Sequence, residues 1–178
     1  DHEFLDKGAL VVAQEILIDY NRSGDDSFIP ADWVKAAVDF EIPAEGDRQS
    51  GFDVSGDGDN KSVYTFRIGP TVCRQTEFAY ATMQENLEHA LSCADEDRTA
   101  QFSYDASGIG GPIWGHIKFT ERKLRFNLDG IKGNSSASER YLFPEGVQAK
   151  DKFFNKRAEN CWNLRERFRK TFEHRRGV

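Results

Sequence analysis

The sequence has few cysteines and no long apolar run. Three cysteines occur among 178 residues, and because an odd number cannot pair completely, we expect no disulfide framework and a reducing compartment. No apolar stretch reaches the roughly 20 residues that a membrane span needs. The N-terminal residues lack the pattern of a signal peptide, and the sequence has no internal repeats or low-complexity tracts. We therefore expect no secretion signal and no membrane contact.

What the chain does have is enough length for one domain with a real core, and an uneven distribution of charge. Its net charge is −6, but residues 150–178 contain ten Lys or Arg and four Asp or Glu, a net +6, so residues 1–149 carry −12. A basic segment of this kind either binds an anionic polymer or is an ordinary solvated helix face. Composition alone leaves both interpretations open.

Apolar periodicity predicts a chain of strands followed by alternating helices and strands. Alternating or short apolar runs predict strands over 50–55, 62–68, 71–78, 100–104 and 124–128. Helical spacing predicts helices over 30–40, 82–93 and 150–174. The last helix has an apolar stripe expected to bind it to the sheet: Phe154, Ala158, Cys161, Leu164, Phe168 and Phe172.

Residues 112–121 fit either a strand or a helix. Topology favours the helix, because a strand–helix–strand unit places its two strands parallel. The expected order is therefore three strands, a helix, a strand, a helix, a strand and a final helix. We expect residues 1–47 to be a segment attached to a domain formed by residues 48–178.

An acidic turn lies within residues 49–60, at the end of the first expected strand. Asp53, Asp57 and Asp59 occur within seven residues, separated by glycines. Carboxylate oxygens are the ligands that hard cations such as Mg²⁺ prefer, although Asp and Gly are also common turn residues. An EF-hand is excluded, because Tyr64 stands where that loop needs a glutamate.

A second acidic position, Asp105, ends the strand at 100–104 and precedes a glycine-rich turn. If the first strand lies parallel beside this one, Asp53 and Asp105 emerge at the same sheet edge, on strands about 4.8 Å apart. Such carboxyl ends are where open α/β sheets bind ligands. Gly108, Gly110 and Gly111 are expected to let a phosphate approach the start of the next helix. By itself, Asp105 is equally a strand-ending residue in a turn.

Three segments carry a specific resemblance. The segments DVSGDGD (53–59), YDASGIGG (104–111) and FNKRAENCWNLR (154–165) resemble, in order and spacing, the nuclease domain of tailed-phage terminase large subunits. The segment IPADWVKAA (29–37) also resembles the lead-in to that domain from the packaging ATPase. The likeness covers the chain from about residue 10 onward. It implies an α/β, ribonuclease-H-like fold, with a mixed sheet flanked by helices.

The resemblance also implies an activity. Members of that family are two-metal-ion DNA endonucleases that cut concatemeric double-stranded viral DNA during packaging, with Mg²⁺ or Mn²⁺ ions about 3.5–4 Å apart. The implied partners are double-stranded DNA, the terminase small subunit and the portal protein, and the implied location is the host cytoplasm. Asp53 and Asp105 match the catalytic metal-bridging carboxylates, and Asp59 matches an accessory metal ligand. Lys156 and Arg157 match positions that could contact DNA phosphate, with a salt bridge inside the helix as the alternative.

The sequence departs from the family in two ways. No Gly-x4-Gly-Lys-Ser/Thr motif occurs, so the ATPase half is missing from this chain. The family's third catalytic carboxylate is expected beyond the helix that ends near His174, so we expect a chain truncated at its C-terminus and an incomplete active site. Glu159 is the alternative third ligand. Two other functions remain open: another ribonuclease-H-like nuclease of the resolvase type, or a catalytically incomplete DNA-binding or regulatory module.

Overall fold

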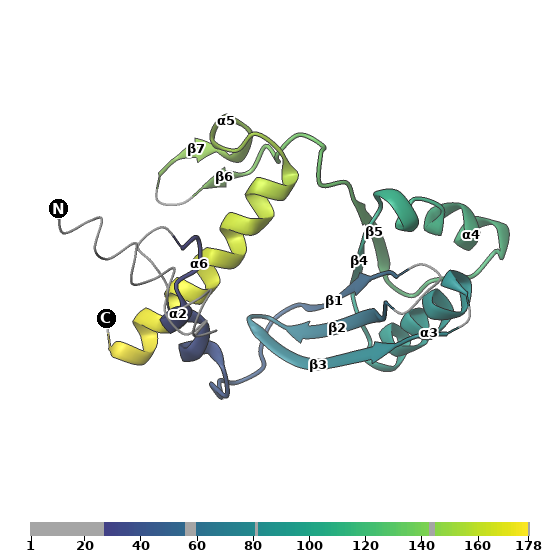
Figure 1. Ribbon diagram of the computed structural model, residues 1–178, viewed down its shortest axis with the longest axis horizontal. Coiled ribbons are helices and arrows are strands. Elements are labelled where there is room, and N and C mark those ends of the chain that lie inside the picture. Colours follow the sequence, from purple (N-terminus) through teal and green to yellow (C-terminus); the bar gives the residue numbers. More distant parts are fainter. Residues whose placement is uncertain (1–26, 56–59, 81, 143–144, 178) are drawn as a thin grey trace, which may run out of the picture. The chain divides into compact units, whose positions relative to one another are not determined.

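The computed structural model describes residues 27–55, 60–80, 82–142 and 145–177. By its internal contacts the chain divides into two compact units (Figure 1). The sheet unit comprises Ile42–Glu159, and the helical unit combines Asp1–Glu41 with Asn160–Val178. The expected division into residues 1–47 and 48–178 stays a prediction. Within the described ranges, no helix combines the length and apolar character needed to cross a bilayer.

A five-stranded mixed sheet forms the centre of the sheet unit, in the order β3-β2-β1-β4-β5. Strand β1 pairs antiparallel with β2, and β2 pairs antiparallel with β3, whereas β1, β4 and β5 run parallel. The strands are β1 (Arg48–Asp53), β2 (Ser62–Ile68), β3 (Thr71–Phe78), β4 (Gln101–Asp105) and β5 (Asn127–Ile131). This is the expected α/β, ribonuclease-H-like arrangement, and from β1 to β5 the strands and α-helices follow the order that the sequence predicted.

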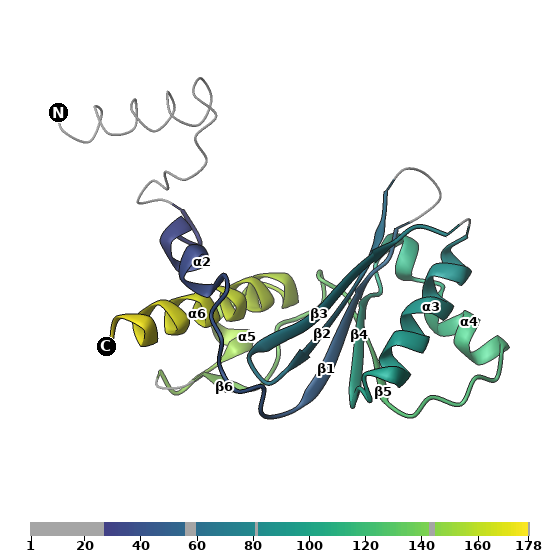
Figure 2. The same ribbon diagram turned by 90° about the horizontal axis from the view of Figure 1, so that it is seen from below.

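Two helices, α3 (Met83–Glu96) and α4 (Ile113–Phe119), cover one face of this sheet (Figure 2). Thr82 starts α3 with a capping box, in which its hydroxyl accepts from Glu85 N and the Glu85 carboxylate accepts from Thr82 N. Within residues 112–121, Ile113–Phe119 form a helix, as topology predicted. The core between helices and sheet is apolar and contains Phe52, Tyr64, Phe66, Phe102, Tyr104, Leu87, Ala90, Leu91, Ile113 and Ile117.

Side chains alternate between the two sheet faces, which explains why the strands could be recognised. Phe52 and Tyr104 point into the core, so the residues on either side of them face the opposite direction. That second face carries polar side chains, among them Ser103 and Asp129. Asp53 and Asp105, which follow Phe52 and Tyr104, belong to this polar face.

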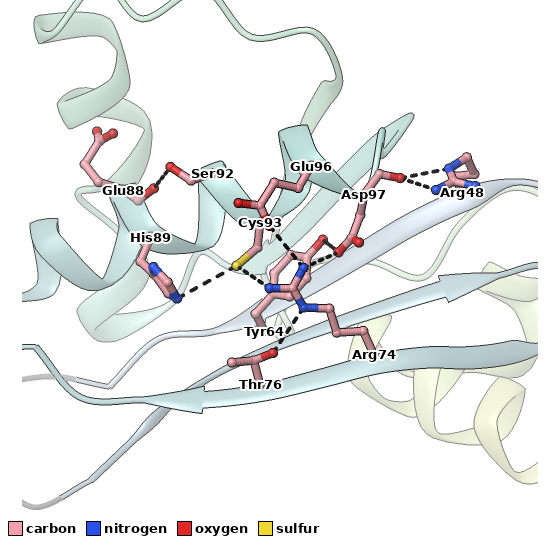
Figure 3. A network of polar contacts seen from close by, with 10 residues as sticks. All are labelled: Arg48, Tyr64, Arg74, Thr76, Glu88, His89, Ser92, Cys93, Glu96 and Asp97. Carbon is pink, nitrogen blue, oxygen red and sulfur yellow. Dashed lines mark hydrogen bonds and ion pairs between the residues drawn. The ribbon is translucent and has the colours of Figure 1, made fainter.

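A polar network joins the C-terminal end of α3 to β2 and β3 (Figure 3). Tyr64 donates to Asp97 Oδ2 at 3.0 Å, and Arg74 reaches Asp97 at 3.4 Å and Cys93 Sγ at 3.2 Å. Arg48 donates to the Asp97 carbonyl from the start of β1. Burial raises the pKa of the Cys93 thiol, which leaves it a poor nucleophile. The network therefore anchors α3 at the end of the sheet opposite to Asp53.

Some boundaries differ from the sequence predictions. Strand β5 begins at Asn127 rather than at 124, because Leu124 and Phe126 pack against the core before strand pairing begins. The sequence predicted no strand between β5 and the last helix, but a small hairpin forms there, β6 (Tyr141–Leu142) with β7 (Val147–Gln148). Two helices replace the single helix expected at 150–174: α5 (Ala149–Lys152) and α6 (Lys156–Arg176). Phe153 separates them, because its backbone is extended.

The predicted apolar stripe of the last helix is wrong. Phe154 precedes α6 and is 96% exposed, and Leu164 is 50% exposed. Phe168, another residue of the stripe, is only half-buried. Glu159 is the buried residue of α6, a carboxylate rather than an apolar side chain.

In the helical unit, α6 contacts the short helix α2 (Ala31–Ala37). The rings of Trp33 and Phe172 lie 6.3 Å apart, and the Arg165 guanidinium lies 4.9 Å above the Trp33 ring. Arg175 donates to the Ala36 carbonyl at 3.1 Å. A tilted aromatic contact, a cation–π contact and a hydrogen bond from arginine therefore join these two helices.

Candidate functional site

Asp53 and Asp105 lie at the carboxyl ends of two neighbouring parallel strands. The paired register of β1 and β4 ends with Phe52 beside Tyr104, so the next residues on each strand are Asp53 and Asp105. Both are exposed, on the polar face of the sheet. Strands paired in this way are about 4.8 Å apart. The structure thus brings these two carboxylates together, as the sequence predicted.

The loop after each strand is held by short-range hydrogen bonds. Asp105 Oδ1 accepts from Ser107 N at 2.8 Å, which folds the chain back immediately after β4. On the other loop, Ser62 Oγ accepts from Ser55 N at 3.0 Å and lies 3.0 Å from Ser55 Oγ. Both serines are buried, so they tie together the two ends of the acidic turn.

The acidic turn itself contains residues 56–59, so Asp57 and Asp59 lie outside the described residues. Residues 27–55, 60–80, 82–142 and 145–177 hold no group of three or more His, Cys, Asp or Glu arranged for a metal ion. The described site is therefore a pair of carboxylates. The pair still suits a hard divalent cation, because both acids are exposed and the hydrogen bond from Ser107 N engages only one oxygen of Asp105.

Gly110 differs from the other glycines of the turn after β4. Gly110 is buried, and a Cβ added there would lie 1.8 Å from the Asp105 carbonyl oxygen. It therefore packs against protein and does not offer its backbone to a phosphate, contrary to expectation. Helix α4 has only seven residues, and Gly108 and Gly111 are exposed.

The segment 155–159, the Asn-Lys-Arg-Ala-Glu signature, attaches the start of α6 to the loop that follows β5. Asn155 Oδ1 accepts from Ala158 N at 2.9 Å and caps the helix. Lys156 N donates to the Ser135 carbonyl at 2.8 Å, and Arg157 N donates to the Gly133 carbonyl at 3.0 Å. The free amide groups of the first helical turn are thus satisfied by loop carbonyls.

Glu159, a buried residue of α6, adds further hydrogen bonds between α6 and the segment that contains Ser138 and Arg140. It is 1% exposed, and its carboxylate accepts from Ser138 N (2.8 Å), Ser138 Oγ (2.7 Å), Arg140 Nε (2.9 Å) and Lys156 Nζ (3.2 Å). Burial alone would raise the pKa of Glu159, but the hydrogen bonds from Ser138 and Lys156 lower it to about 2. Four donors occupy the two oxygens, so the structure gives Glu159 a structural role and not that of a third metal ligand. Sequence reasoning missed this role.

The two basic residues of the signature are placed differently. Lys156 forms the ion pair with Glu159, the alternative that the sequence left open. Arg157 is exposed, and its side chain lies against Gly133, where an added Cβ would be 3.1 Å from Arg157 Nε. Gly133 follows Ile131 by two residues, and Ile131 is the strand partner of Asp105. Within the part of the chain that the structure describes, Arg157 has no ion-pair partner.

The sequence matches no protein-family model and no curated protein. Solved structures do match. The nuclease domain of the large terminase subunit of bacterial virus Sf6 aligns with a TM-score of 0.73 and 26% identity over 83% of this chain. A mutant of that domain with manganese and beta-thujaplicinol aligns with a TM-score of 0.72 and 25% identity, and a mutant with calcium with 0.72 and 26%.

This chain spans 66% of the length of each of these solved domains. The match extends over 83% of this chain, at TM-scores of 0.72 to 0.73. The resemblance to the nuclease domain of phage large terminase subunits, first indicated by three short motifs, is therefore confirmed by the fold.

Proposed function

We propose that this chain is the metal-dependent endonuclease domain of a phage packaging terminase, which cuts concatemeric double-stranded viral DNA. The observation that carries the proposal is the register of β1 and β4, which sets Asp53 beside Asp105 at the carboxyl edge of the sheet. The likeness to the Sf6 domain supports the assignment to packaging.

Asp53 and Asp105 are the residues that would hold the metal, with Asp59 as an accessory ligand. Mg²⁺ or Mn²⁺ suits oxygen ligands of this kind, and relatives have been solved with manganese and with calcium. Bound divalent cations supply Lewis-acid activation of water and of the scissile phosphate. The second of two ions needs a further anionic ligand. Since Glu159 is fully engaged elsewhere, we expect that ligand to come from a carboxylate outside the described pair.

The chain's own residues orient the DNA. The two carboxylates are exposed on a polar sheet face, so a phosphodiester can approach them without rearrangement of the strands. Arg157, anchored through its backbone to Gly133, offers a guanidinium to a flanking phosphate. Contacts to phosphate carry little sequence information, so we expect weak sequence specificity.

The reaction is hydrolysis. A bond forms between the water oxygen and phosphorus, and the bond between phosphorus and O3′ breaks. One proton of the water passes to O3′ and the other to solvent, which leaves a 5′-phosphate and a 3′-hydroxyl. By the same family resemblance, the proposed partners are the terminase small subunit and the portal protein, and the proposed location is the host cytoplasm.

Plasmid nicking in Mn²⁺ tests the proposal. Asp53→Asn and Asp105→Asn should each abolish metal-dependent nicking without changing the melting temperature, because both residues are exposed and the change is nearly isosteric. Asp129→Asn is the matched control: it is an exposed carboxylate on the same sheet face, two residues before the end of β5. Nicking that survives in Asp53→Asn would contradict the assignment.

Two further substrates separate the competing functions. A four-way DNA junction cut much faster than linear duplex would favour a resolvase-type nuclease. Binding of duplex without any cleavage in high Mn²⁺, by a chain that also carries the further carboxylate ligand, would favour a DNA-binding or regulatory module. The proposal expects duplex DNA to be cut with no preference for junctions.

A further inference from the structure

The turn after β4 forms a closed loop of contacts around the second carboxylate. Asp105 Oδ1 accepts from Ser107 N at 2.8 Å, and the Ser107 carbonyl accepts from Gly110 N at 3.2 Å. Gly110 in turn lies directly against the Asp105 carbonyl. The side chain of Asp105 and its own backbone are thus tied to one another through two residues of the turn.

Gly110 also contacts the segment that carries the first carboxylate. A Cβ at Gly110 would lie 3.3 Å from Val54 Cγ1, and Val54 directly follows Asp53. Val54 is partly buried and packs against the core, which holds it in place relative to the sheet. Gly110 is therefore the place where the chain after β1 meets the chain after β4.

No side chain can occupy this point without moving one of the two strand ends. The distance of 1.8 Å from a Cβ to the Asp105 carbonyl oxygen is far inside van der Waals contact, and the obstructing atom is backbone, which cannot swing aside. Gly115, in α4, is the natural comparison, since an added Cβ there meets nothing within 4 Å.

We infer that Gly110 is a positioning residue: the absence of its side chain lets the turn after β4 close beside Val54 and on the Asp105 carbonyl, which holds in place the two carboxylates that the strand register sets side by side. The inference deepens the proposed function and rests on it for its consequence, which is tighter metal binding. The positioning itself is a property of the protein without metal.

Two measurements on Gly110→Ala test the inference. Mn²⁺ affinity, followed by loss of the free-ion electron paramagnetic resonance signal, should fall by about tenfold or more, in the range seen when groups that orient metal ligands are removed. Amide exchange at Ser107, followed by ¹⁵N NMR without metal, should accelerate as its hydrogen bond to Asp105 is lost. Gly115→Ala should leave both unchanged. A purely structural role for Gly110 would lower the melting temperature without either local effect.

The outcomes separate this inference from the proposed function. If wild type and Asp105→Asn take up Mn²⁺ equally, the proposed metal site is wrong, and exchange at Ser107 alone decides the positioning role. If Gly110→Ala retains both Ser107 protection and Mn²⁺ affinity, the inference is overturned. Should Gly110→Ala fail to fold, Val54→Ala removes Cγ1, the Val54 atom that faces Gly110, without a clash. It should weaken Mn²⁺ binding and speed Ser107 exchange, and no change in either would overturn the inference.

Discussion

Replacing Glu159 by glutamine should destabilise the sheet unit by about 3 kcal/mol. The magnitude follows from the pKa: a fall from the ordinary 4.5 to about 2 corresponds to roughly 3 kcal/mol at 1.36 kcal/mol per pKa unit. Glutamine keeps the shape but directs an NH₂ group at donors that need an acceptor. The melting temperature should drop by roughly 10 °C.

The same reasoning predicts a dependence on pH. In the unfolded chain the Glu159 carboxyl titrates near 4.5, and in the folded chain its pKa is about 2. The carboxylate therefore contributes its full stability above pH 4.5 and loses it progressively as pH falls towards 2. The stability difference between wild type and Glu159→Gln, measured by urea denaturation, should be constant from pH 7 to about pH 5 and shrink below that.

Glu139→Gln is the matched control. Glu139 directly follows Ser138, the residue that donates to Glu159, and pairs with Lys150 at 3.0 Å, but its side chain is 79% exposed. An exposed pair of this kind contributes about 0–1 kcal/mol. The reasoning is refuted if Glu159→Gln costs no more than Glu139→Gln, or if the cost is unchanged between pH 5 and pH 3.

Two further predictions concern the core and the DNA contact. Phe102→Ala should cost about 3–5 kcal/mol by chemical denaturation, because Phe102 is fully buried, whereas Phe119→Ala, at an 88% exposed position, should be nearly neutral. Equal costs would show that the core is misplaced. Arg157→Ala should weaken DNA binding and lower the slope of log affinity against log salt concentration by about 1. Lys150→Ala, which removes a cation already paired with a surface glutamate, should leave that slope unchanged, and the same slope in both variants would contradict a phosphate contact at Arg157.

Much of the sheet unit could be predicted from sequence because its signals are local. Alternation of Phe52, Tyr64, Phe66 and Phe102 with polar neighbours marks strands with one buried face. The strand–helix–strand order then constrains the pairing, since such crossovers place their strands parallel. The pairing of Asp53 with Asp105 was conditional on the first strand lying parallel beside the strand that ends at Asp105, and the register of β1 and β4 shows that it does.

The errors lie where local patterns are ambiguous. An apolar residue every three or four positions marked a stripe through Phe154 and Leu164, yet periodicity does not say whether a surface is available to cover it, and both are exposed. Leu124 and Phe126 resembled strand residues but pack against the core ahead of β5.

By itself, the sequence determined the order of the elements, the placement of two carboxylates at strand ends and the likeness to a terminase nuclease. Only the tertiary structure decided what Glu159 and Gly110 do. Glu159 accepts hydrogen bonds from Ser138, which lies 21 residues away in the sequence. The buried carboxylate stays ionised because Ser138 and Lys156 donate to it, since an isolated carboxylate would not be stable in the protein interior. Gly110 has no room for a side chain, because the Asp105 carbonyl occupies the space. Both facts arise from atoms brought together by folding, which no spacing along the chain records.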